Sequence, residues 1–116
     1  MLQRIIKFRA WDESQNYMAY QGTPDLETIQ SFMFHFGDRP LMLFTGLADK
    51  SGKDIYEGDI VLHKFRRAWK TDLHKSEVVW NQEYCCYYLN DGTTNHRMRD
   101  DMVYEVVGNV YEGKNS

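Results

Sequence analysis

The sequence predicts a small, mainly β protein: a strongly bent antiparallel sheet or compact SH3-like barrel with one or two short helices. The main helix is an inserted amphipathic one at about residues 24–36. Aromatic residues make up 15% of the 116-residue chain, and such side chains favour half-buried pleated surfaces. Short apolar segments alternate with closely spaced turns, a pattern typical of small barrels and strongly bent sheets. A more open sheet packed on the helix is the alternative architecture.

The N-terminal segment predicts a β-hairpin. Residues 4–11 alternate between two faces, one carrying Ala10 and the other carrying Arg9 and Trp11. This alternation predicts a first strand with one face in solvent. A short turn then leads to residues 17–20, which form the returning strand.

The helix prediction rests on a start signal and an apolar stripe. Thr23 provides an N-cap hydroxyl and Pro24 fits the first helical position, while Gly37 is placed to end the helix. We interpret the stripe as core or as an oligomer contact rather than as a ligand site, because burying such a stripe is its ordinary use. Its members are Leu26, Ile29, Phe32, Met33 and Phe36.

The remaining elements are short strands and turns. Residues 41–44 predict a strand, and turns at 49–52 and 57–59 lead into a strand at 60–62. The segment 63–75 has weak periodicity and is expected to be a long loop or ragged hairpin tip. Further strands are predicted at 78–80, 84–89 and 102–111, the last as a short hairpin or bent strand. Without a linker or repeat, we expect residues 1–116 to form a single domain.

Three blocks of the sequence resemble the YopX family, small proteins typical of bacteriophages and prophages. They are KFRAWD at 7–12, TGLADKSGKDIYEGDIV at 45–61, and YEVVGNVYE at 104–112. The resemblance implies a mostly β fold with an SH3-like barrel element, some helix, and self-association. It implies no activity, because the family has no established one and offers no catalytic residues to carry over.

The polar residues of the central block are interpreted as turn residues. Asp49 and the residues after it lack the glycine and glutamate that complete a calcium loop. Glu57 and Asp59 could be paired carboxylates for acid–base chemistry, but an aspartate after Gly58 commonly accepts backbone N–H groups instead. We therefore predict no catalytic residue here.

Histidines and cysteines give no metal or cofactor prediction. The four histidines are scattered without ligand spacing. Cys85 and Cys86 are adjacent in a predicted strand, where neighbours point to opposite faces, so we expect no mutual disulfide and expect one of them to be buried. No apolar run approaches the roughly 18 residues of a membrane span, and the N-terminus lacks signal-peptide features. Cytoplasmic localisation is the expectation.

The basic segment 63–75 is the main candidate for binding a partner. The chain has a net charge of −3, yet this segment carries five cations and one acid. Its cations could neutralise phosphates while its aromatic rings stack on unpaired bases; the alternative is a solvated loop with locally packed rings. The candidate nucleic-acid contacts are Lys64, Phe65, Arg66, Arg67, Trp69 and Lys70.

Two functional hypotheses follow. The first is a non-enzymatic structural or interaction module of a phage or prophage that forms a homo-oligomer. The second is a nucleic-acid-binding accessory protein that uses the segment 63–75. The sequence identifies no cofactor, no small-molecule substrate and no membrane partner. It contains no recognisable catalytic constellation, so we do not expect an enzyme.

Overall fold

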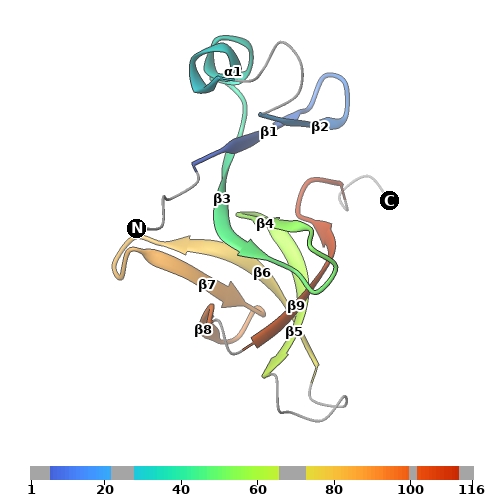
Figure 1. Ribbon diagram of the computed structural model, residues 1–116, viewed down its shortest axis with the longest axis vertical. Helices are drawn as coiled ribbons and strands as arrows, with labels where there is room; N and C mark the ends of the chain where they lie inside the picture. The colour runs from blue at the N-terminus through green and yellow to red at the C-terminus, as the bar shows by residue number, and fades with distance from the viewer. Residues whose placement is uncertain (1–5, 22–27, 66–72, 100–101, 113–116) are drawn as a thin grey trace.

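The computed structural model describes residues 6–21, 28–65, 73–99 and 102–112 (Figure 1). Within these residues the chain forms two antiparallel sheets and one short helix, so the mainly β prediction is confirmed. The elements are β1 (Phe8–Asp12), β2 (Tyr17–Tyr20), α1 (Ile29–Phe36), β3 (Leu41–Ala48), β4 (Asp54–Tyr56), β5 (Asp59–Phe65), β6 (His74–Asn81), β7 (Cys86–Asn90), β8 (Asn95–Arg97) and β9 (Met102–Asn109).

The first sheet has the strand order β2-β1-β3-β4. The predicted N-terminal hairpin is confirmed, with Ala10 paired to Ala19. Together with Phe32 of α1, these two alanines form a small core of their own. Small side chains on the hairpin let the helix approach closely, so the aromatic ring fills the space between helix and sheet.

Helix α1 ends where the sequence predicts but begins later. The Thr28 hydroxyl accepts a hydrogen bond from the Ser31 N–H, so Thr28 is the N-cap in place of Thr23; residues 22–27 lie outside the described part of the chain. Of the predicted stripe, Phe32 is fully buried but Met33 is 41% exposed. The other members of the predicted stripe lie outside the described side chains.

Strand β3 pairs with β1 along its first part and with β4 along its last part. Its first residues, Leu41 to Leu43, pair with β1, while Phe44 and Ala48 pair with β4 across an irregular stretch. Gly46 in that stretch has a φ of +88°, a conformation that residues with a Cβ rarely adopt. Figure 1 shows β3 running from the β1–β2 end down to the larger sheet.

The second sheet has the order β8-β7-β6-β5-β9 and is strongly curved. Its inner face and the β3–β4 hairpin enclose the main core, in which Ile55 of β4 packs against strand residues of the sheet. A half-barrel closed by this hairpin is therefore the observed form of the predicted bent sheet. The buried members of the core are Ile55, Val61, Val78, Leu89, Met102 and Tyr104.

Several local predictions need correction. Strand β1 has no solvent face, since Arg9 and Trp11 are 2% and 5% exposed. The segment 63–75 is not all loop: β5 continues to Phe65 and β6 begins at His74. Cys85 lies in the β6–β7 turn with a φ of 53° and is exposed, so the expected buried cysteine is not found; both cysteines are free, as expected.

Candidate functional site

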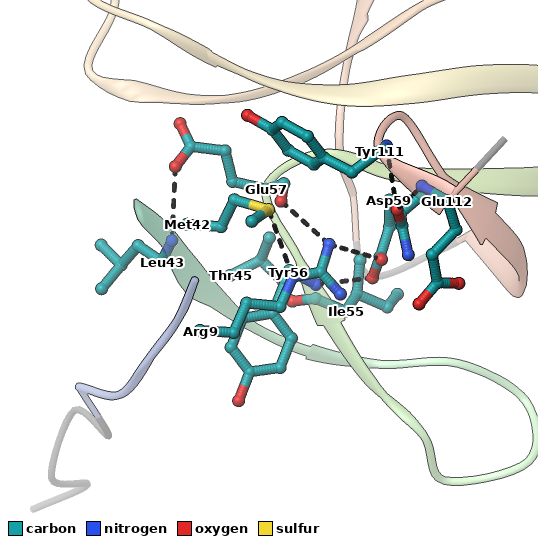
Figure 2. A network of polar contacts seen from close by, with 11 residues as sticks. Arg9, Met42, Leu43, Thr45, Ile55, Tyr56, Glu57, Asp59, Tyr111 and Glu112 are labelled. Carbon is teal, nitrogen blue, oxygen red and sulfur yellow. Dashed lines mark hydrogen bonds and ion pairs between the residues drawn. The ribbon is translucent and has the colours of Figure 1, made fainter. Parts of the chain in front are cut away.

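A buried ion pair joins the two sheets (Figure 2). Arg9 of β1 places Nη2 2.8 Å from the Asp59 carboxylate at the start of β5, and both side chains are 2% exposed. The same Nη2 donates to the carbonyl oxygen of Glu57 at 3.2 Å, and the guanidinium lies 4.8 Å from the centre of the Tyr56 ring. The arginine is thus bound on several sides, as a buried cation requires.

Asp59 also has a turn role. Its Oδ2 accepts the Tyr56 N–H at 2.8 Å, which confirms the predicted use of this aspartate. Burial raises the pKa of Asp59, and the positive charge of Arg9 opposes that rise. Glu57, the other carboxylate considered for catalysis, accepts the Leu43 N–H through Oε1. Both carboxylates therefore accept backbone N–H groups.

The third block of the family resemblance meets the other two at this place. Tyr111 stacks on Trp11 of the first block, with ring centres 5.8 Å apart and an interplanar angle of 19°. The Val110 N–H donates to the Gly58 carbonyl of the second block, and Asp59 is the cross-strand partner of Asn109. We call this meeting point of the three blocks the joint.

Asp49 makes a second connection between blocks. Its Oδ1 accepts the Ser51 and Lys53 N–H groups at 2.9 Å each, and its Oδ2 accepts the Val106 N–H of β9 at 3.1 Å. Burial raises the pKa of Asp49, but these three hydrogen bonds outweigh it and hold the pKa below its usual value. The predicted turn chemistry is confirmed, with a tie to the edge strand β9 in addition.

At the far end of the larger sheet lies a pocket of about 450 Å³. It is formed where β5 ends, β6 begins and the chain passes from β8 into β9. We call it the basic pocket. Its described lining residues are His63, Lys64, Phe65, His74, His96, Arg97, Arg99 and Met102.

Positive charge converges on the basic pocket. Lys64, Arg97 and Arg99 line it, and no Asp or Glu is among its described lining residues. The Arg99 guanidinium lies 5.6 Å from the centre of the Phe65 ring, and Phe65 is 51% exposed. Arg97 is additionally held by the Tyr88 hydroxyl, which raises its pKa. A flat ring next to cations is the arrangement that unpaired nucleotides can stack on.

Three histidines also line the basic pocket. His63 is 3% exposed; its Nε2 is 2.8 Å from the Ser76 hydroxyl, and its Nδ1 has no hydrogen-bond partner among the described residues. The His74 ring lies 5.7 Å away, centre to centre. Burial lowers the pKa of His63, the charges of His74 and His96 lower it further, and Asp91 opposes. Nothing in the described chain forms a metal-binding group.

The structure changes the candidate set in both directions. Of the six candidate nucleic-acid contacts, Lys64 and Phe65 line the basic pocket. The other four lie outside the described residues: Arg66, Arg67, Trp69 and Lys70.

Three of the four histidines, His63, His74 and His96, line the pocket together, and Arg97 and Arg99 line it without being among the contacts predicted from the sequence. For the histidines, a hairpin in which His63 pairs with His74 would have predicted that these two lie side by side. The contribution of β8 had no such signal, because the loop composition of residues 90–95 hid a three-residue strand.

The YopX protein family matches residues 23–115. The chain belongs to the YopX family. Its fold is similar to the crystal structure of protein EF1440 from Enterococcus faecalis, with a TM-score of 0.60, 21% sequence identity and coverage of 97% of each chain. No curated protein matches the sequence. No helix in the described ranges has the length and apolarity needed to cross a membrane.

Proposed function

We propose that this YopX protein is a non-enzymatic interaction module that binds single-stranded nucleic acid at the basic pocket. The observation that carries the proposal is the convergence of Lys64, Arg97 and Arg99 beside the half-exposed Phe65, with no acid among the described lining residues. In a chain of net charge −3, such a cluster provides a local positive field that attracts polyanions.

The residue types favour a single strand over a duplex. An exposed ring next to a guanidinium offers a stacking platform for an unpaired base, worth about 1–3 kcal/mol per base. Lys64 and Arg99 supply charge to the flanking phosphates, and this part of the binding falls as salt rises.

Fluorescence anisotropy with labelled oligo-dT and with a duplex of equal length tests the proposal. We expect the single strand to bind more tightly at low salt. Arg99→Ala should weaken binding and reduce the slope of log affinity against log salt by about 1. Lys64→Ala should have the same effect as Arg99→Ala. Its matched control is Lys75→Ala, because Lys75 is an exposed cation on the adjacent strand that does not line the basic pocket. An absence of binding at low salt would refute the proposal.

Self-association is a second proposed property, supported by α1. Phe34 is 85% exposed and its neighbour Met33 is 41% exposed, and a second copy of the chain would bury both. Size-exclusion chromatography with light scattering should give a mass above that of one chain, and Phe34→Ser should return the mass to the monomer. A strict monomer at high micromolar concentration would contradict this.

The proposed setting is the cytoplasm of a bacterium that carries a phage or prophage. Two free cysteines among the described residues are in keeping with a reducing compartment. Cell fractionation under native expression tests the location.

A further inference from the structure

We infer that the basic pocket holds one phosphate group and that His63 takes up a proton from solvent when it binds. This inference rests on the proposed function, whose ligand it specifies. It gives His63 a part in binding, whereas attraction of the ligand by surface cations alone would need no histidine.

The first observation is the unsatisfied nitrogen of His63. The side chain is 97% buried and lines the pocket, its Nε2 is taken by Ser76 outside the lining, and its Nδ1 is left without a partner in the described structure. A neutral imidazole with one nitrogen accepting carries its proton on the other. If Ser76 donates to Nε2, then Nδ1–H is a donor, and a phosphate oxygen is a suitable acceptor for it.

The second observation is that an exposed histidine ring lies beside His63 at the pocket. His74 is exposed and its ring is tilted by 32° against His63, with the centres 5.7 Å apart. We expect rotation of the His74 side chain to give a phosphate access to Nδ1, since an exposed side chain can change rotamer without moving the core. An entering phosphate would then contact His63 from within and His74 from the rim.

The third observation is the charge around the pair. Lys64 comes from β5, His96 and Arg97 from β8, and Arg99 from the segment after β8, while Asp91 acts as an opposing negative charge. Burial, His74 and His96 hold the pKa of His63 below its ordinary value. An anion in the pocket reverses that effect, because opposite charge nearby favours the protonated ring.

The consequence is a linkage between binding and pH. A ligand that raises the pKa of a histidine must bind more tightly as pH falls through the range in which that histidine titrates. A rise of about one pKa unit corresponds to about tenfold tighter binding. The pocket of about 450 Å³ is within the usual range for sites that take a small ligand group.

Histidine NMR titrations test this directly. The pKa values of His63, His74 and His96 are measured in the free protein and with oligo-dT that lacks terminal phosphates, because its diester charge is constant over the pH range. We expect the pKa of His63 to rise on binding, and affinity to increase about tenfold from about pH 8 to pH 5.5. Binding of the strand with unchanged histidine pKa values would overturn the inference and leave the proposed function standing.

Two further ligands distinguish the source of the phosphate. Inorganic phosphate and thymidine monophosphate are titrated into the protein alone and into the complex with the strand. A rise in the His63 pKa with inorganic phosphate, in a protein that binds no strand, would keep the phosphate site and remove the nucleic-acid proposal. Failure of every ligand to shift the His63 pKa refutes the phosphate site.

A variant gives a second readout. His63→Gln should remove most of the pH dependence of strand binding while retaining the salt dependence that Lys64 and Arg99 supply. Lys75→Ala should retain both. If His63→Gln does not fold, the titration of the unmodified protein decides the question by itself.

Discussion

The joint and the basic pocket both gather charged side chains, but they treat them in opposite ways. At the joint, Arg9 and Asp59 are each 2% exposed and neutralise one another at 2.8 Å. At the basic pocket, Lys64, Arg97 and Arg99 converge with no acid among the described lining residues. The first arrangement pairs opposite charges inside the fold, and the second gathers charges of one sign around a pocket.

The joint and the basic pocket are formed by different parts of the sequence. All three blocks of the family resemblance meet at the joint, where Tyr111 stacks on Trp11 and Asp59 pairs with Arg9. The described lining residues of the basic pocket lie outside those blocks: His63–Phe65, His74, His96, Arg97, Arg99 and Met102. The recognisable motif therefore specifies how the sheets are joined, and binding is expected where the motif is absent.

The largest expected effect comes from breaking the joint. Arg9→Met should lower the free energy of unfolding by about 3–5 kcal/mol, because it leaves the Asp59 carboxylate buried without its partner. Urea unfolding followed by tryptophan fluorescence measures this. Lys7→Met is the matched control: Lys7 pairs with Asp54 at a partly exposed position, where an ion pair is worth about 0–1 kcal/mol. Equal losses in the two variants would contradict the contrast.

A smaller loss is expected at Asp49. Asp49→Ala removes the acceptor of three backbone N–H groups, one of them on β9, and should cost about 1–3 kcal/mol. Asp91 also accepts backbone N–H groups, but only within its own turn. Asp91→Ala should therefore cost less in the same urea titration, and a larger loss at Asp91 would show that the tie to β9 is unimportant.

The pH dependence of stability tests the basic pocket without a ligand. Since the pKa of His63 is lowered in the folded state, the unfolded chain binds more protons as pH falls through about 6.5. Stability should therefore be full above that pH and decrease below it, by about 1.4 kcal/mol for each unit by which the pKa is lowered. His63→Gln should flatten the curve between about pH 7.5 and 5.5, and a curve that keeps its slope would assign the loss to other groups.

The smallest effect on stability is expected for the pocket cations. Arg99→Ala should lower the free energy of unfolding by about 0.5–1 kcal/mol, the value of a cation–π contact at an exposed site, and Lys64→Ala by about 1 kcal/mol or less. The thermal midpoint measured by circular dichroism checks this. A marked loss would mean that these residues hold the fold together, and any loss of binding would then have to be reinterpreted.

Sequence periodicity predicts the N-terminal hairpin and the central turns, but it misses β8 and does not predict which residues cover β1. The hairpins, the turn at Asp49 and the capping role of Asp59 follow from local residue types, and the structure confirms them. Arg9 and Trp11 were predicted to face solvent because alternation assumes one wet face. Their burial depends on Asp59 and Tyr111, partners about 50 and 100 positions away, which no local pattern encodes.

The basic pocket was only partly foreseen for a similar reason. Lys64 and Phe65 stood out because their segment is rich in cations and rings. Arg97, Arg99 and His96 belong to a segment of loop-like composition, and only the pairing of β8 with β7 brings them to the same end of the sheet. Charge that is spread along the sequence can thus be concentrated in space by strand order alone.

Strand β3 has a further consequence for how the molecule opens. It hydrogen-bonds to β1 through its first residues and to β4 through its last, and Ile55 of β4 packs in the core of the larger sheet. Separation of β1 and opening of that core should therefore both disturb the hydrogen bonds of β3. Among the amides of the first sheet, we expect those of β3 to exchange most slowly, including that of Phe44, which donates to the Lys7 carbonyl.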